Sequence, residues 1–276
     1  MEQLEIAVKA ALEAGAAILE IYEQDFEVEY KDDKSPLTSA DKASHEIIVA
    51  ALETTPYPVL SEESAAVDYE ERRGWSTYWL VDPIDGTKEF IKKNGEFTVN
   101  IALIENGRPI AGVVFVPVQD TLYVGSSDGA WKVEGCAGKS EFELIAAADE
   151  ISVSGKPRGV LKVVASKSHC NDETRAFIAQ LEKEHGEAEL VSRGSSLKLC
   201  MVAEGAADIY PRVAPTMEWD TAAAHAVVTA AGGRVFQFDP DIDAKSYHTG
   251  TNTVNDLVYN KRDLLNPYFV VSGLHE

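Results

Sequence analysis

A short apolar run ends in two carboxylates at Trp79-Leu80-Val81-Asp82-Pro83-Ile84-Asp85-Gly86-Thr87. The apolar residues 78–81 predict a buried strand that stops abruptly at Asp82-Pro83, because proline fixes φ and has no N–H for the ladder. Gly86 permits a sharp turn with a close approach of the backbone. We therefore expect the carboxylates of Asp82 and Asp85, three residues apart on this turn, to converge on one point.

Two carboxylates this close repel each other, and the repulsion raises the pKa of one of them strongly unless a cation lies between them. A hard divalent cation takes oxygen ligands and would make both Asp82 and Asp85 its ligands. A strand-end turn whose acids are simply solvated is an equally good interpretation of this spacing taken alone.

Acidic residues at other predicted element ends favour the metal interpretation. Glu62 and Glu63 follow the apolar pair Val59-Leu60, again at the end of a predicted strand. Asp220 stands at the start of an Ala-rich helix, where a plain N-cap role is the simpler interpretation and is compatible with metal binding. Asp41 stands at a third such position, the start of another predicted helix. Because acidic proteins commonly carry acids at element ends, the spacing alone leaves both interpretations open.

The first half of the chain predicts helices lying against an antiparallel sheet. Apolar residues recur with helical spacing over 2–22 and alternate with polar residues over 26–30. Asn106-Gly107 between two β-branched runs is the strongest short-range signal for a hairpin. The predicted elements are helices at 2–22, 38–53 and 88–92 and strands at 26–30, 78–81, 96–104, 108–116, 121–125 and 130–133.

After about residue 155 strand and helix patterns alternate, which predicts an α/β layer with some parallel pairing. We therefore expect two subdomains, an N-terminal α+β part over residues 1–150 and a C-terminal α/β part over 151–276. The elements predicted after residue 155 are strands at 160–165, 188–191, 208–211, 234–238 and 257–260 and helices at 171–185, 195–204 and 220–231.

The 276 residues carry 46 Asp and Glu against 25 Lys and Arg, a formal charge of −21. This balance argues against nucleic-acid binding through phosphate attraction and against a polybasic membrane patch. An anionic substrate would need a local cation to offset the repulsion. No stretch approaches the ~18 apolar residues of a membrane span, and the N-terminus lacks the signal-peptide pattern.

The three cysteines are widely spaced, with no C-x-x-C, and fit a reducing compartment. We therefore expect a cytoplasmic protein. The sequence leaves open whether it also associates peripherally with the cytoplasmic face of the inner membrane, and whether it is a monomer or a homodimer.

Two long segments resemble the signatures of the inositol monophosphatase superfamily. The first is Trp79–Ile91, and the second is Trp219–His225 followed by Ala231-Gly232-Gly233. The resemblance runs nearly end to end and implies a layered αβαβα sugar-phosphatase fold. Three further segments are similar to one branch of the superfamily, the 3′(2′),5′-bisphosphate nucleotidases of the CysQ type: Lys31–Asp41, Gly194–Lys198 and Tyr210–Arg212.

The resemblance implies that Mg²⁺ is bound in the N-terminal subdomain, with Asp82 bridging two ions. The carboxylate of Glu62 and the carbonyl of Ile84 would complete one site, and Asp85 and Asp220 the other. Two ions ~3.5–4 Å apart stabilise both the attacking and the leaving oxygen of a phosphoryl transfer. This physical role agrees with the clustering of acids at element ends.

The catalytic residues implied by the resemblance are Asp41, Thr87 and Glu62. Asp41 and Thr87 would position and activate the attacking water. Asp33, in the loop before the helix at 38–53, would contribute to a third, weaker Mg²⁺ ion, so that two or three ions serve the site. The resemblance leaves open whether Glu63, the neighbour of Glu62, contacts a metal ion.

The second phosphate and the nucleoside of a bisphosphate substrate need their own site. Gly194, Ser195 and Ser196 at a predicted helix start would offer N–H groups and hydroxyls to an anion, although Ser195 also fits an N-cap. Lys198 and Arg212 are the candidate positive charges. The remaining expected substrate contacts are Ile84, Asp85, Gly86, Thr87 and Asp220.

The implied activity is Mg²⁺-dependent hydrolysis of adenosine 3′,5′-bisphosphate (PAP) to AMP and phosphate by attack of a metal-activated water. The sulfated nucleotide PAPS, converted to APS, is a second candidate substrate. Such an enzyme would clear a by-product of sulfate assimilation, and Li⁺ would inhibit it.

Three alternatives remain open. The same chemistry on inositol or sugar phosphates is the nearest of them. An aspartyl-phosphate enzyme uses two acids separated by one residue, whereas Asp82 and Asp85 are separated by two. A cation-binding protein without catalysis is the third, and the chain lacks the spacing of an EF-hand.

Overall fold

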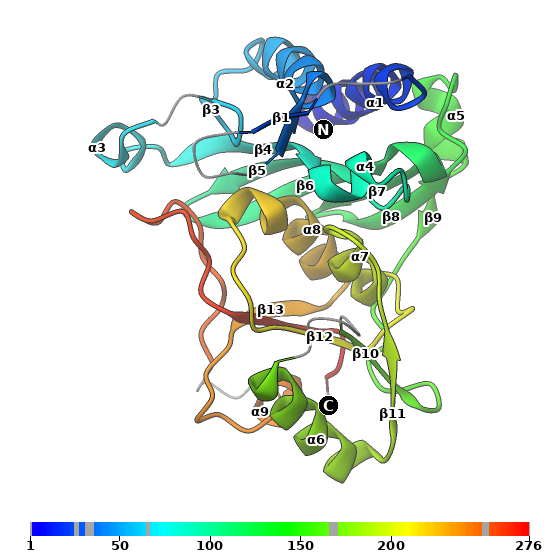
Figure 1. Cartoon of the computed structure of the whole chain (residues 1–276), viewed down its shortest axis with the longest axis vertical. Helices are drawn as coiled ribbons and strands as arrows, with labels where there is room; N and C mark the ends of the chain where they lie inside the picture. Colours follow the sequence, from blue (N-terminus) through cyan, green and yellow to red (C-terminus); the bar gives the residue numbers. More distant parts are fainter. Residues whose placement is uncertain are drawn as a thin grey trace.

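The computed structural model describes residues 2–24, 28–30, 36–64, 67–165, 171–249 and 254–275, and Figure 1 shows its elements stacked in five layers. Two helices cover the outer face of a seven-stranded sheet, two lie between this sheet and a five-stranded sheet, and two cover the far face of the second sheet. In that order the helices are α1 (Glu2–Tyr22) and α2 (Ser39–Leu52), α7 (Leu197–Ala203) and α8 (Glu218–Ala230), and α6 (Asp172–His185) and α9 (Ser246–Thr249).

The seven-stranded sheet follows chain order, because hairpin connections keep consecutive strands adjacent. Only the first pair is parallel, and each later pair is antiparallel. Asn106 and Gly107 adopt φ of 50° and 75°, which suits the predicted hairpin turn. The strands are β3 (Val59–Ser61), β4 (Thr77–Asp85), β5 (Thr98–Glu105), β6 (Arg108–Val116), β7 (Thr121–Ser126), β8 (Gly129–Glu134) and β9 (Asp149–Glu150).

The five-stranded sheet has the order β11-β10-β12-β14-β13. Its first three strands are parallel, as the alternating pattern predicts, and β14 pairs antiparallel with both of its neighbours. The strands are β10 (Leu161–Val164), β11 (Ala188–Val191), β12 (Ile209–Arg212), β13 (Arg234–Gln237) and β14 (Phe269–Ser272). The smaller elements of the chain are β1 (Val28–Tyr30), β2 (Pro36–Thr38), α3 (Tyr69–Arg72), α4 (Thr87–Ile91), a 3₁₀ turn (Pro117–Gln119) and α5 (Glu141–Ala146).

Helix α8 packs directly against the backbone of the seven-stranded sheet. A Cβ added at Gly112 in β6 would lie 2.2 Å from the carbonyl oxygen of Ala223, and one at Gly125 in β7 would lie 2.5 Å from Cα of Val227. The residues of α8 that face the sheets are mostly alanine, whose small side chains allow a close approach on both sides. The helix is therefore buried between the seven-stranded and the five-stranded sheet. These contacts hold the start of α8, and therefore Asp220, close to the end of β4.

One strand prediction is wrong, and one strand was not predicted. Residues 257–260 do not form a strand, because the chain there turns to place Tyr259 into the core beside His225. The central antiparallel strand is instead β14 (Phe269–Ser272), whose four buried residues lie between two strands and show no alternation.

The expected end of β4 at Asp82-Pro83 is also wrong, since the strand continues to Asp85 through an irregularity in its pairing. The division of the chain near residue 150 stays a prediction. Within the described residues, no helix is both long enough and apolar enough to span a bilayer.

Candidate metal and phosphate site

The irregularity in β4 puts two carboxylates on the same face of the sheet. Asp82 pairs with Asn100 and Asp85 pairs with Thr98, so three steps along β4 match two steps along β5. Residues three apart in a regular strand point to opposite faces, and one extra residue brings them to the same face. The bulge contains Pro83, whose missing N–H leaves no donor unpaired in the ladder. The bulge thus produces the convergence expected from the sequence.

Glu62 approaches the same place from the neighbouring strand. Parallel pairing sets Ser61 of β3 beside Val81 of β4, and the Glu62 N–H donates to the Val81 carbonyl at 3.0 Å. The next residue on each strand, Glu62 after Ser61 and Asp82 after Val81, therefore lies at the same end of the parallel pair. Burial raises the pKa of Asp82 most, and Glu62 raises it further by charge repulsion and by a side-chain hydrogen bond that protonated Asp82 donates, which fits two neighbouring carboxyl groups.

Asp220 enters from the first turn of α8. Its Oδ2 accepts a hydrogen bond from the Met217 N–H at 2.9 Å, and Met217 is the N-cap. The N-cap role considered for Asp220 is therefore wrong, because the residue stands three positions further on and reaches back to the cap. Its other carboxylate oxygen is left for the site.

Asp41 and Thr87 lie together at the edge of the carboxylate cluster. The Thr87 hydroxyl can donate to Asp41 Oδ1 at 3.2 Å or to the Ile84 carbonyl at 3.4 Å. Asp41 is 1% exposed, and its Oδ2 accepts from both the N–H and the hydroxyl of Thr38, at 2.7 and 2.6 Å. These bonds fix the Asp41 carboxylate at the first turn of α2 and link it to the turn after β4.

Burial and repulsion from neighbouring acids raise the pKa of Asp82, Asp85 and Asp220 at the centre of this site. Burial is the largest cause throughout. The pKa of Asp82 lies well above its usual range, that of Asp220 is raised to about 8, and that of Asp85 is raised to about 6. Lys198 offsets part of the rise at Asp85. A cluster that would hold protons at neutral pH indicates a place where cations replace them.

We define the carboxylate cluster as Glu62, Asp82, Asp85 and Asp220. Its donors are all oxygens, which suit Mg²⁺ or Ca²⁺ better than a transition metal. No three of these four acids, all within the described part of the chain, bring oxygens within 4.8 Å of one another. The cluster is therefore wider than the cage of a single ion, and its donor chemistry fits hard divalent cations.

The segment 194–196 makes different contacts from those expected. Helix α7 begins at Leu197, Ser195 has a φ of 48°, and its hydroxyl lies 2.8 Å from the carbonyls of both Asp85 and Glu96. The N-cap role considered for Ser195 is therefore wrong. A Cβ added at Gly86 would lie 2.1 Å from the Ser195 Oγ, so the two turns touch through a glycine.

The other donors of this segment also bond to protein groups. The Gly194 N–H donates to Glu96 Oε2 at 2.7 Å, and the Ser196 hydroxyl lies 2.9 Å from Asn100 Oδ1 and 2.8 Å from the Thr98 hydroxyl. The segment thus supports the turn after β4, and its contact with a substrate phosphate stays a prediction.

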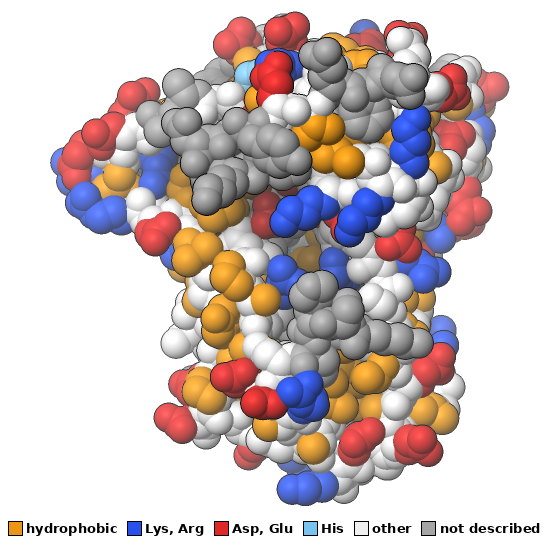
Figure 2. Space-filling view, in the orientation of Figure 1, with side chains coloured by type: hydrophobic (Ala, Val, Ile, Leu, Met, Phe, Trp, Pro, Cys, Tyr) orange, Lys and Arg blue, Asp and Glu red, His pale blue; other side chains and the backbone are white. Residues whose placement is uncertain are grey.

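Two cations border the carboxylate cluster. Lys198 is held by the Ser195 carbonyl at 3.0 Å and interacts with Asp85, and Arg212 lowers the pKa of Asp220 while donating to the Pro215 carbonyl at 3.2 Å. Figure 2 shows Lys and Arg side chains around a hollow in the middle of one face of the molecule. A chain of net charge −21 thus presents positive charge locally at the mouth of a hollow.

Sequence reasoning missed residues that hold this site from behind. The Ser44 hydroxyl donates to the Pro83 carbonyl at 2.8 Å and fixes the bulge. Glu218 is fully buried and accepts from the N–H groups of Asn260 and Lys261 and from Lys261 Nζ at 2.6 Å, which ties the start of α8 to a distant loop. A charged residue on the apolar face of a helix is the signal that could have revealed Glu218. Asp33 lies outside the described residues.

A model of the inositol monophosphatase family matches residues 1–273 of the chain. The chain is 48% identical over 236 residues to the 3′(2′),5′-bisphosphate nucleotidase CysQ of Salmonella typhimurium, covering 84% of this chain and 89% of the relative. The Escherichia coli protein of the same name is 47% identical over the same coverage.

Solved structures of this family are also similar to the chain. The crystal structure of CysQ from Bacteroides thetaiotaomicron is 49% identical, covers 98% of this chain and 97% of its own, and superposes with a TM-score of 0.83. An inositol monophosphatase from Zymomonas mobilis superposes with a TM-score of 0.69, over 99% of this chain and 92% of its own, at 21% identity. That second likeness concerns the fold alone.

Proposed function

This chain belongs to the inositol monophosphatase family, and we propose that it is a Mg²⁺-dependent 3′(2′),5′-bisphosphate nucleotidase that hydrolyses PAP to AMP and phosphate. The observation that carries the chemistry is the carboxylate cluster, four acids from three elements brought to one edge of a sheet. The identity of 48–49% to relatives named for this activity supports the substrate. The inositol monophosphatase from Zymomonas mobilis, which is 21% identical to this chain, supports only the fold.

Glu62, Asp82, Asp85, Asp220 and the Ile84 carbonyl would hold two Mg²⁺ ions, with Asp33 contributing to a third. Mg²⁺ at such a site lowers the pKa of water and neutralises the charge of a phosphoryl group. Asp41 and Thr87 hold the attacking water, because Asp41 accepts the Thr87 hydrogen and leaves the Thr87 oxygen to accept one from water. Asp41 then takes up the proton through this hydroxyl.

The anionic ends of the substrate meet the cations at the site. Lys198 and Arg212 lie beside Asp85 and Asp220 and would bind the second phosphate of the nucleotide. The turn at Gly86-Thr87 starts α4 and leaves N–H groups for phosphate oxygens. Gly194, Ser195 and Ser196 keep this turn in place and complete the wall of the site.

A substrate panel tests the proposal. Purified protein is given PAP, PAPS and inositol 1-phosphate at matched concentrations, with Mg²⁺ titrated from zero and Li⁺ added at saturating Mg²⁺. We expect kcat/KM for PAP to exceed that for the inositol ester by at least about a hundredfold, which corresponds to about 2.7 kcal/mol of transition-state discrimination. Li⁺ should inhibit and Mg²⁺ should be required. A preference for the inositol ester would overturn the nucleotide assignment while leaving the metal chemistry intact.

A further inference from the structure

A second group of metal-binding side chains lies on the far side of the five-stranded sheet. Glu184 and His185 end α6, and His248 belongs to α9. Among the described residues, these three are the only His, Cys, Asp and Glu side chains that bring three ligand atoms within 4.8 Å of one another. Figure 1 shows α6 and α9 at the opposite end of the molecule from β4, so this group is separate from the carboxylate cluster.

The Nε2 atoms of both histidines of this group are buried without a hydrogen bond to any described residue, although the His185 side chain as a whole is 22% exposed. His248 is 8% exposed, and neither its Nε2 nor the Nε2 of His185 has a hydrogen-bond partner among the described residues. A buried ring nitrogen without a partner is unfavourable, and proteins retain very few such groups. A bound ion would satisfy both nitrogens at once.

The two rings already have the spacing of imidazoles that share an ion. Their centroids are 5.2 Å apart, with an angle of 42° between the planes. Imidazoles bound to one tetrahedral ion through bonds of ~2.1 Å have ring centres about 5 Å apart. Glu184 Oε2 lies 3.9 Å from His185 Nε2, and its side chain is 33% exposed, so a side-chain rotation can bring it to the same ion.

The charges around the rings suit a cation bound by neutral nitrogen. Burial lowers the pKa of His248 to about 4, so its ring is neutral at physiological pH. Glu184 and Asp243 provide negative charge there, and Lys245 opposes it. Two imidazoles and one carboxylate select Zn²⁺ and similar transition ions over Mg²⁺, which takes oxygen ligands.

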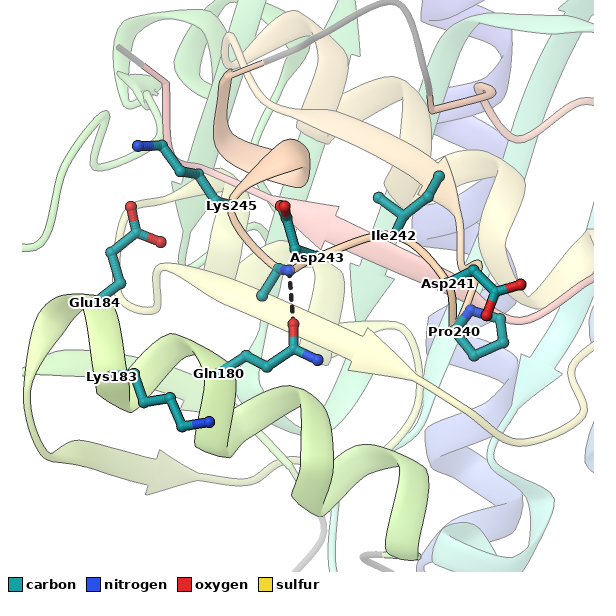
Figure 3. A pocket seen from close by; sticks show the side chains of 9 residues that line it. Gln180, Lys183, Glu184, Pro240, Asp241, Ile242, Asp243 and Lys245 are labelled. Carbon is teal, nitrogen blue, oxygen red and sulfur yellow. Dashed lines mark hydrogen bonds between the residues drawn. The ribbon is translucent and has the colours of Figure 1, made fainter.

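An open cavity of about 460 Å³ adjoins this group, between α6 and residues 240–245. Figure 3 shows Glu184 and Lys245 on one side of it, and Gln180 further along α6, whose Oε1 accepts from the Ala244 N–H at 2.9 Å. The cavity gives solvent access to the exposed side of Glu184. Water can therefore supply a fourth ligand.

We propose that Glu184, His185 and His248 bind one Zn²⁺-class ion that joins α6 to α9, apart from the catalytic centre. The ion would connect two helices that otherwise meet mainly through apolar packing on the outer face of the five-stranded sheet. Its role is structural, because the site lies away from the acids assigned to phosphate chemistry.

Zinc binding in saturating Mg²⁺ tests this proposal, because Mg²⁺ occupies the carboxylate cluster. Equilibrium dialysis of the full chain against Zn²⁺, followed by metal analysis, should give one bound ion per chain. Co²⁺ added in its place should give the intense visible absorption of a tetrahedral nitrogen-containing site. We expect Glu184→Gln, His185→Gln and His248→Gln each to weaken Zn²⁺ binding by at least about tenfold.

His275→Gln, which removes an exposed histidine elsewhere, is the matched control and should bind Zn²⁺ as the unchanged chain does. Glu184 is exposed, so its variant folds and keeps the test valid even where a histidine variant does not. PAP hydrolysis with Mg²⁺ alone should be the same in all four variants. Zn²⁺ binding that survives all three ligand substitutions, or that is lost only in Asp82→Asn, would overturn the proposal.

Discussion

Asp82 is the residue on which the carboxylate cluster is centred. It is 1% exposed, it feels repulsion from all three of its acidic neighbours, and its only hydrogen bond from the backbone comes, among the described residues, from the Ile84 N–H at 3.1 Å. An ionised carboxylate in this place is stable only beside a cation. An aspartate at this position therefore lowers the stability of the metal-free protein, and a bound cation would offset that loss.

Replacing Asp82 with Asn should separate the two properties. We expect kcat for PAP to fall by more than about a hundredfold, because the group proposed to bridge the ions is lost. The melting temperature in EDTA should stay the same or rise, since the neutral amide removes the cost of protonating a buried carboxyl whose pKa is ordinary in the unfolded chain. Calorimetry and phosphate release measure the two effects. An active Asp82→Asn enzyme would refute the assignment of the site.

The pH dependence of stability without metal follows from the raised pKa values of Asp85 and Asp220. Their pKa is near 3.9 in the unfolded chain and about 6 and about 8 in the folded one. The folded state thus binds more protons between these limits, and the free energy of unfolding falls as the pH rises. Each contribution is complete below about pH 4 and is lost as the pH passes through about 6 for Asp85 and about 8 for Asp220.

Melting temperatures in EDTA should therefore fall between pH 5 and 8, and the increase caused by Mg²⁺ should grow over the same range. In Asp220→Asn, the decline between pH 6 and 8 should be smaller, and the part that remains should come from Asp82. A melting temperature in EDTA that rises steadily to pH 8 would contradict these pKa values.

At the scale of the element, sequence periodicity located most helices and strands, and it failed where the periodicity itself disappears. The four residues of β14 (Phe269–Ser272) are all buried, so no alternation marks the strand. Tyr259 lies in an apolar run, yet it serves the core by hydrogen bonding with His225 and Thr221. The proximity of Asp82, Asp85 and Asp220 could be expected from the sequence because all three belong to long motifs, and their use as metal ligands stays a prediction. The bulge and the Ser44 contact depend on register, which no local pattern reveals.

Helix α8 offers the sharpest test at this scale. In Gly112→Ala the added Cβ would lie 2.2 Å from the Ala223 carbonyl, so the helix must move away from the sheet. We expect a loss of about 1–3 kcal/mol in the free energy of unfolding and a fall in kcat, because Asp220 moves with the helix. Gly74→Ala is the matched control, since its nearest neighbour would be 3.7 Å away and its φ is ordinary.

Chemical denaturation and PAP hydrolysis measure the two Gly112 effects. If Gly112→Ala is as stable and as active as Gly74→Ala, then α8 does not depend on this close contact.

At the scale of the whole molecule, the formal charge of −21 is a property of the surface, and it is distinct from the site. Four acids of the carboxylate cluster account for little of the excess. The remainder is spread over exposed positions, where like charges repel one another and salt screens them. The hollow bordered by Lys and Arg in Figure 2 is a local exception, where positive charge favours an anion.

Screening of this surface should stabilise the folded chain. With EDTA present at pH 8, KCl raised from low concentration to about 0.5 M should raise the melting temperature by a few degrees, since the Debye length falls below about 5 Å. Near pH 4.6, where the net charge vanishes, the same salt should have little effect. Equal salt effects at both values of pH would show that the net charge does not govern this stability.

Helix α8 lies between the two sheets and also carries Asp220, so the activity proposed for the carboxylate cluster should report how cooperatively the two sheets unfold. Because α8 packs against both sheets, loss of the five-stranded sheet would remove one side of its packing and loosen the position of Asp220 relative to the other three acids of the carboxylate cluster. Separation of the sheets should therefore lower turnover. Amide exchange in α8 should then proceed at the rate of the slowest amides of β4 and β14, and inactivation by denaturant should not lag behind unfolding. We therefore expect the two sheets to unfold together and activity to be lost in the same transition.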